Sequence, residues 1–245
     1  MLVLIRLSAM IYAFPFFGSP AITGRVKIMI TLVLSFMILP LAGIDGLGLD
    51  WGLGQLTLSV GRELGLGLVV GFGSKFMFEA FALAGTFAGR QMGFAMADLI
   101  DPVTSAPQSM VGQFWALLAI LLFLAVDGHH FLIRLMIQNF QIIPLGVGQL
   151  RPATGRLLIT GSSDMFQLAL RLAAPALMLT LMMDVGMAIL SRAMPRFQIF
   201  FVALPLKLYV GIFSLVVTLQ LFQALFTTVF ADFQEYLVDL LATMR

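Results

Sequence analysis

Hydrophobic residues fill most of the chain in long stretches, which glycines, prolines and isolated charges separate. The clearest stretches are Leu2–Phe17, Ile28–Leu41, Leu56–Phe87, Val111–Val126, Phe131–Ile143, Met165–Ser191 and Ile199–Phe230. A helix that spans a bilayer needs about 20 apolar residues, whereas a stretch of about 10–14 is more often re-entrant or buried in protein. Several of these stretches are shorter than one crossing and two are longer. The pattern predicts an all-α membrane protein but leaves the number of spans open.

Composition excludes an ordinary water-facing surface. Of the 245 residues, 60% are hydrophobic and only 11% are charged, and the mean hydropathy is +1.04. Soluble domains carry about 25% charged residues. The 14 basic residues are scattered, so the chain has no footprint for nucleic acid. No long polar stretch divides the chain, and we expect a single domain over residues 1–245 in contact with membrane lipid.

The N-terminal stretch Leu2–Phe17 could be either a retained helix or a signal peptide that is cleaved off. Pro15 and the pair Phe16-Phe17 stand where a cleavage site would need small residues. We therefore expect this segment to be retained as the first helix.

Prolines interrupt the hydrophobic pattern at Pro15, Pro20, Pro40, Pro144, Pro175, Pro195 and Pro205. Each removes a helical hydrogen bond and clashes with the preceding turn, so we expect a kink or a helix end at each. Arg25 and Lys27 predict a cytoplasmic loop. Arg151 and Arg156 are also basic, yet simple alternation of five long spans puts them outside. Either Phe131–Ile143 also crosses the bilayer, or the helices do not cross it in ordinary series.

Ionisable residues lie inside the apolar stretch Leu56–Phe87. Lys75 and Glu79 are four residues apart, so they share a helix face and can form an ion pair. Glu63 can pair with a neighbouring helix, and Lys207 is a further charge within an apolar stretch. Such residues normally face protein or water rather than lipid. The alternative is that they lie near a helix end and extend to the membrane surface.

Glycines four residues apart recur in the same stretch. The pairs are Gly61 and Gly65, Gly67 and Gly71, Gly85 and Gly89, and Gly89 and Gly93. Small residues at this spacing let another helix approach the backbone closely. Repeated pairs predict that this helix packs against protein along much of its length.

No arrangement of residues indicates an enzyme or a cofactor site. His129 and His130 are adjacent and project about 100° apart on a helix, so they make a poor metal pair without a third ligand. We expect Gly128 to cap the helix before them. The chain has no cysteine, no nucleophile with its base, and no glycine-rich nucleotide loop. We expect no catalytic residue, no metal and no cofactor.

Three motifs carry a resemblance to a known family. Ala84–Gly93 ends in Gln91-Met92-Gly93, and Asp101-Pro102 and Asp127-Gly128-His129 follow it. Together with Ala21–Lys27 and Pro205–Gly211, these residues resemble the FliR family, also called SctT. That family supplies a subunit of the export gate in flagellar and virulence type III secretion systems. The resemblance runs from about Arg6 to the end of the chain, and the motifs favour the flagellar branch.

The resemblance implies kinked helical hairpins like a fusion of the FliP and FliQ folds. It implies a non-enzymatic subunit of a pore for unfolded polypeptides in the bacterial inner membrane at the flagellar basal body, lying largely above the membrane plane. The implied partners are five FliP and four FliQ subunits, an FlhB-like subunit, an FlhA-like export ring and the exported polypeptides. Members of the family usually begin with additional residues before the position of Arg6.

The segment from Gly93 to about residue 110 resembles the plug of that family. The resemblance implies that Phe94, Met96, Leu99 and Ile100 seal the resting pore and that Gly93, Asp101 and Pro102 bound the plug loop. Met96 and Leu99 stand where the family commonly has aromatic residues. The alternative for these side chains is ordinary packing of a turn against a neighbouring helix.

Two other functions remain possible from the residues alone. A small-solute secondary transporter also uses broken helices and buried charges, but it predicts an internal repeat, which the chain lacks. A purely structural membrane scaffold would leave an assembled pore behind when it is lost.

Overall fold

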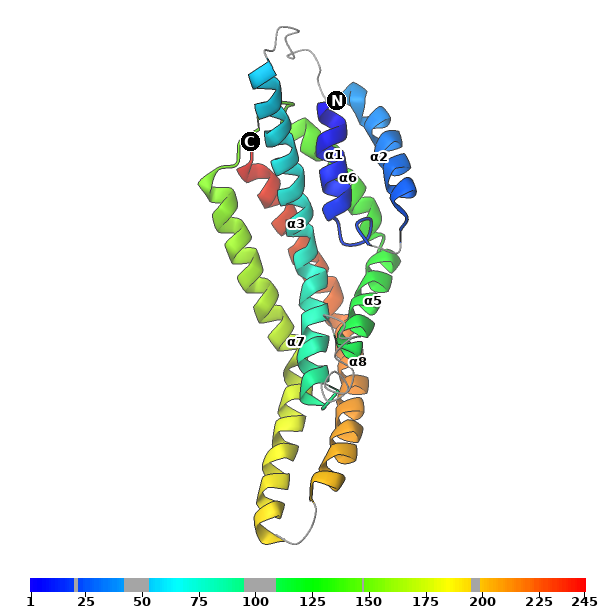
Figure 1. Ribbon diagram of the computed structural model, residues 1–245, viewed down its shortest axis with the longest axis vertical. Coiled ribbons are helices and arrows are strands. Elements are labelled where there is room, and N and C mark those ends of the chain that lie inside the picture. Colours follow the sequence, from blue (N-terminus) through cyan, green and yellow to red (C-terminus); the bar gives the residue numbers. More distant parts are fainter. Residues whose placement is uncertain (20–21, 42–52, 95–108, 147, 195–198) are drawn as a thin grey trace. The chain divides into compact units, whose positions relative to one another are not determined.

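The computed structural model describes residues 1–19, 22–41, 53–94, 109–146, 148–194 and 199–245. Helices are the only regular elements within these residues, which confirms the all-α prediction. The elements are α1 (Leu2–Ala13), α2 (Gly24–Ile38), the short 3-10 helix η1 (Leu39–Leu41), α3 (Leu53–Gln91), α5 (Met110–Ala125), α6 (Gly128–Ile142), α7 (Pro152–Ala193) and α8 (Ile199–Thr243) (Figure 1).

Three helical segments among the described residues are long and apolar enough to cross a membrane. They are Gly54–Gln91, Pro152–Ala193 and Val202–Gln220. Within the most apolar part of α3, 67% of the residues are buried inside the chain, against 22% in α7 and 17% in α8. The chain is therefore an all-α membrane protein in which α3 packs mainly against protein.

The helices α5 and α6 pass the same test only as a pair, and they are bent by 74° at the break between them. At this break Asp127 adopts a left-handed conformation with φ 58°, and Gly128 is the first residue of α6. A side chain at Gly128 would clash with the ring of Phe123. The left-handed turn thus belongs to Asp127, not to Gly128 as expected, because Gly128 is needed for the close contact. The stretch Phe131–Ile143 is one arm of this broken pair.

Prolines mark some helix ends but not all. Pro15 follows the end of α1, Pro40 lies in η1, and Pro144 follows the end of α6. Pro175 and Pro205 lie inside α7 and α8, which continue through them. Membrane helices tolerate internal proline because neighbouring groups and local adjustments satisfy the freed backbone carbonyl. Pro20 and Pro195 lie outside the described residues.

The packing divides the chain into two compact units. Unit 1 comprises Met1–Met77, Phe123–Ser163 and Phe230–Arg245, and unit 2 comprises Phe78–Leu122 and Asp164–Val229. Both units are assembled from separate stretches of sequence, so no single linker divides them.

In unit 1, α1 lies directly on the glycines of α3. A Cβ atom at Gly67 would lie 2.7 Å from the Cβ of Ala9, and one at Gly71 would clash with the Cβ of Ala13. The many dispersion contacts along the helix face stabilise this close packing of α1 on α3. Figure 1 shows α1 beside both α3 and α2.

Replacing Gly71 by leucine should push α1 off α3 and lower the melting temperature of the purified protein in detergent. Overpacking of this kind costs about 1–3 kcal/mol or more. Gly155→Ala in α7 is the matched control, because a Cβ there meets nothing within 4 Å. A Gly71→Leu protein that melts with the wild type would contradict the α1–α3 contact.

A buried polar cluster joins α1, α3 and α6 in unit 1. Arg6 of α1 and Glu63 of α3 form an ion pair, and both side chains are fully buried. Arg6 also donates to Asn139 Oδ1 at 3.1 Å and to the Ile143 carbonyl at 2.8 Å. Glu63 accepts a further bond from the Gly146 amide at 2.8 Å. The guanidinium lies 4.8 Å from the centre of the Phe140 ring. The pair is thus enclosed by donors and acceptors that compensate its desolvation.

Removing one member of this pair should be far worse than removing both charges. Arg6→Met leaves a buried carboxylate without its partner, which costs about 3–5 kcal/mol. In Arg6→Met/Glu63→Gln the amide still accepts from Gly146 and no charge is left. We expect a lower melting temperature in detergent for Arg6→Met than for the double variant. Equal losses would show that the charges are not coupled.

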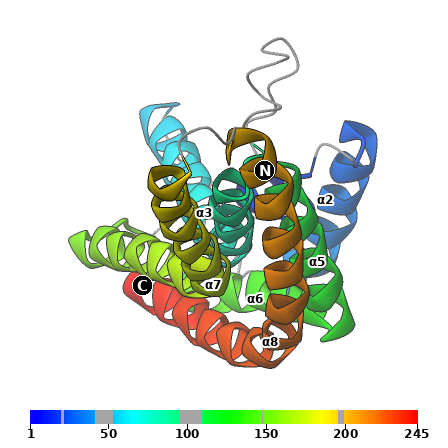
Figure 2. The same ribbon diagram turned by 90° about the horizontal axis from the view of Figure 1, so that it is seen from below.

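In unit 2, aromatic side chains form the core between α3, α5 and α8. The ring of Phe81 lies 4.5 Å from that of Phe222, and Trp115 meets Phe222 edge-on at 5.4 Å between centroids. All three side chains are fully buried. Figure 2 shows α5 running beside α8, as this contact requires. This core holds the ends of α3 and α5 together.

Candidate functional site

The predicted plug lies between α3 and α5. Met96, Leu99, Ile100, Asp101 and Pro102 fall outside the described residues. The structure describes the two ends of the segment, Gly89–Phe94 and Ser109–Gly112, all within unit 2. We call these two ends the loop base.

Helix α3 ends in a motif that sets the direction of the loop. Gly93 has a φ of +91°, and its amide donates to the Arg90 carbonyl at 3.1 Å. The amide of Phe94 donates to the Gly89 carbonyl at 3.2 Å. These two bonds define a Schellman motif, in which a left-handed glycine ends the helix and the next residue packs back on it. Phe94 packs against the buried cluster of Ala88, Met92 and Ala176. Gly93 therefore lies at the start of the loop, where the sequence predicted a boundary.

Glycines bring the other end of the loop against α3. A Cβ atom at Gly85 would lie 2.7 Å from the Val111 carbonyl oxygen and 2.8 Å from the Gly112 Cα. One at Gly89 would lie 2.8 Å from the hydroxyl of Ser109. That hydroxyl accepts from the Gly112 amide at 3.0 Å. The loop therefore leaves and re-enters the helices at one place.

A polar group ties the end of α3 to α7 and α8. Gln91 Nε2 donates to Asp184 Oδ2 at 3.1 Å, and the Lys207 amine lies 2.9 Å from the same carboxylate. The Lys207 side chain is 23% exposed and that of Asp184 is 41% exposed. An ion pair this open to solvent contributes only about 0–1 kcal/mol to stability. Its main effect is to fix the positions of the three helices.

An apolar contact beside this group completes the loop base. Met92 is fully buried and packs with Ala88, Ala176, Phe94 and Leu215. A Cβ atom on Gly211 of α8 would clash with the Met92 side chain. Gly211 thus leaves the space that Met92 occupies. Gln91, Met92, Gly93 and Phe94 each hold the loop base by a different contact.

The remaining predicted site residues lie in other places. Glu63 is buried in the cluster with Arg6, and Gly67 and Gly71 pack against α1. Lys75 is half-buried, and Glu79 is exposed. Gly61 has nothing within 4 Å of a Cβ position. Lys207 is only partly buried, because its amine reaches the carboxylate of Asp184.

Sequence reasoning missed Asp184, Ser109 and Gly211 as parts of the site. Gly211 lies in the motif Pro205–Gly211, and Asp184 is a lone carboxylate in the apolar run from Leu177 to Ile189. A lone charge in such a run calls for a partner. Its partner Lys207 was noted only as a charge.

The histidines belong to unit 1, whereas the loop base belongs to unit 2. His130 Nδ1 is 3.3 Å from Asp127 Oδ1, and both side chains are mostly exposed. With His129 they offer three ligand atoms within 4.8 Å of one another. All three come from one turn at the start of α6, where the helix dipole disfavours a cation. We assign them to the turn between α5 and α6.

The helices, the buried charges and the anchored loop define an α-helical membrane protein built around close helix contacts. The family model of bacterial export proteins, family 1, matches residues 1–233, and the chain belongs to this family. The resemblance to FliR proteins is confirmed. The chain is 30% identical to the flagellar biosynthetic protein FliR of Bacillus subtilis (strain 168) over 250 aligned positions, covering 99% of this chain and 94% of that protein. It is 28% identical to the protein of that name from Escherichia coli (strain K12), covering 98% and 92%.

Substituting Gly211 by alanine should displace Met92 and loosen the loop base. The chain has no cysteine, so Phe94→Cys supplies a single reporter for thiol alkylation. We expect faster alkylation in Gly211→Ala than in the parent, and a return towards the parent rate when Met92→Ala is added. Gly186→Ala in α7 is the control, since a Cβ there meets nothing within 4 Å. Equal rates in all variants would contradict the contact.

Proposed function

We propose that the chain is a non-enzymatic subunit of the flagellar type III protein export gate. The observation that carries this proposal is the family match over residues 1–233, together with relatives that are named flagellar biosynthetic proteins. In this proposal the protein forms a pore for unfolded export substrates with FliP and FliQ. The gate stands in the bacterial inner membrane at the flagellar basal body, largely above the membrane plane.

The loop base supports a plug on the segment from residue 93 to about residue 110. A plug must block ions that would flow down their gradient, and an exported polypeptide must still be able to displace it. Contacts with α7 and α8 hold the α3 end of the segment, and the glycines of α3 hold its α5 end, while Gly93 ends α3 in a left-handed turn. Phe94, Met96, Leu99 and Ile100 supply apolar side chains over this segment.

The sealing mechanism follows from the chemistry of these side chains. A narrow constriction lined by apolar groups excludes water and therefore ions. Methionine is flexible and unbranched, so it can close around side chains of many shapes. Asp101 and Pro102 would bound the segment on its second side. No bond is made or broken in this function.

The proposed partners are five FliP and four FliQ subunits, with an FlhB-like subunit and an FlhA-like ring at the gate. Native mass spectrometry of the complex extracted after co-expression tests this composition. One copy of this chain with two kinds of smaller membrane subunit supports the gate. A lone monomer or homodimer in the presence of stable partners would favour a small-solute transporter instead.

Deleting Phe94–Ile100 should raise ion conductance through the assembled gate, because the apolar constriction is lost. The measurement is single-channel or liposome-flux conductance of purified complexes whose subunit composition has been checked. A matched control replaces residues 43–49, between α2 and α3, by glycine and serine. Conductance equal to that of the wild type in an intact complex would rule out the plug.

A further inference from the structure

One face of α3 in unit 1 has the spacing of a helix–helix contact. Gly61, Gly65, Leu68, Phe72 and Lys75 follow one another at alternating steps of four and three residues. Residues at these steps form one seam along a helix, the pattern by which two helices pack at a small angle. Leu68 is 44% exposed and Phe72 is 54% exposed. The seam is therefore open within this chain.

The glycines on this seam differ from the glycines of α3 that lie under a neighbouring helix. Gly67 and Gly71 lie under α1, and Gly85 and Gly89 lie under the start of α5. A Cβ at Gly61 meets nothing within 4 Å, and one at Gly65 meets only the Leu150 side chain at 3.3 Å. Gly61 thus has room for the backbone of another helix, and at Gly65 the Leu150 side chain would have to turn aside. An acyl chain would not need that room.

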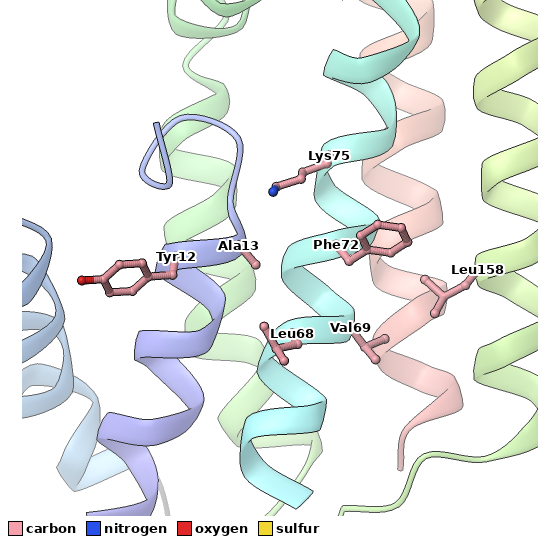
Figure 3. A pocket seen from close by; sticks show the side chains of 7 residues that line it. All are labelled: Tyr12, Ala13, Leu68, Val69, Phe72, Lys75 and Leu158. Atoms are coloured by element: carbon pink, nitrogen blue, oxygen red, sulfur yellow. The ribbon is translucent and has the colours of Figure 1, made fainter. Parts of the chain in front are cut away.

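The seam passes through a groove. Tyr12 and Ala13 of α1 and Leu158 of α7 line a cavity of about 480 Å³ together with Leu68, Phe72 and Lys75. Figure 3 shows Phe72 and Leu158 projecting on one side of α3 and Lys75 extending on the side of α1. All of these residues belong to unit 1.

Among the described residues, Lys75 is the only charged residue that lines this groove. It forms no ion pair or hydrogen bond within the part of the chain that the structure describes. A half-buried ammonium among apolar groups normally pairs with an anion. The occupant must therefore bring a negative charge to this end of the seam.

We propose that the seam Gly61–Gly65–Leu68–Phe72–Lys75 binds an apolar helix of another gate subunit, which places an aspartate or glutamate against Lys75. This inference rests on the proposed function, because it assigns a partner helix to the gate. Glycines at one end set the close approach, Leu68 and Phe72 supply the apolar contact, and Lys75 fixes the register. A helix that lacks the acid would leave the ammonium desolvated and unpaired.

A photo-reactive amino acid in place of Leu68 tests this in the co-expressed, purified complex. We expect a cross-link to an apolar peptide of another subunit that carries an acidic residue. Lys75→Glu should lower the cross-link yield at least about tenfold, since two acids would then face each other. Lys75→Arg, the control that keeps the charge, should leave the yield near the wild-type value. Changing the partner's acid to lysine should restore the yield in Lys75→Glu, which a misfolded variant could not do.

Three outcomes would overturn the inference while the proposed function stands. The first is a cross-link to phospholipid alone, and the second is a cross-link yield that Lys75→Glu leaves unchanged. The third is the absence of any cross-link in a complex that native mass spectrometry shows to be assembled. A wild-type chain that never enters a complex would overturn the proposed function and this inference together.

Discussion

Both units depend on the close approach of a second segment to glycines of α3. Gly67 and Gly71 receive α1, while Gly85 and Gly89 receive the start of α5. A helix lined with larger side chains would hold its neighbours farther away, and the contacts that follow would not form. Arg6 reaches Glu63 because α1 lies so close to α3, and Ser109 reaches the Gly85 carbonyl at 3.4 Å for the same reason. The polar contacts thus depend on the close packing of the backbones.

The buried and half-buried ion pairs of this protein hold its helices in position. The Arg6–Glu63 pair is enclosed and fully satisfied by Asn139, Ile143 and Gly146. The Asp184–Lys207 pair is partly open, and its stabilising energy is small. The first holds together the core of unit 1, and the second joins the end of α3 to α7 and α8. Lys75 differs from both because no group among the described residues forms an ion pair with it.

The sequence predicted the element type and the membrane class, because hydropathy is a local signal, and small-residue spacing pointed to close packing at Gly67, Gly71, Gly85 and Gly89 but also at Gly61, which meets no neighbour. The boundary at Gly93 came from the family resemblance, not from a local rule. It missed Asp184 as the partner of Lys207 and Gln91, since pairing across helices depends on tertiary packing. It expected Gly128 to cap the preceding helix, whereas Asp127 has the left-handed conformation and Gly128 leaves space for the ring of Phe123. The continuation of α7 and α8 through Pro175 and Pro205 also depends on context that no local rule contains.

The contact between Met92 and Gly211 has a consequence for synthesis. A chain leaves the ribosome from its N-terminus, so α3 meets α1 early and meets α5 soon afterwards. Met92, however, finds Gly211 only after α5, α6 and α7 have been made. Until α8 emerges, the loop base has its contacts with α5 and α7 but lacks those with Lys207, Gly211 and Leu215. A nascent chain truncated before α8 would therefore carry an incomplete loop base, which only the last helix completes.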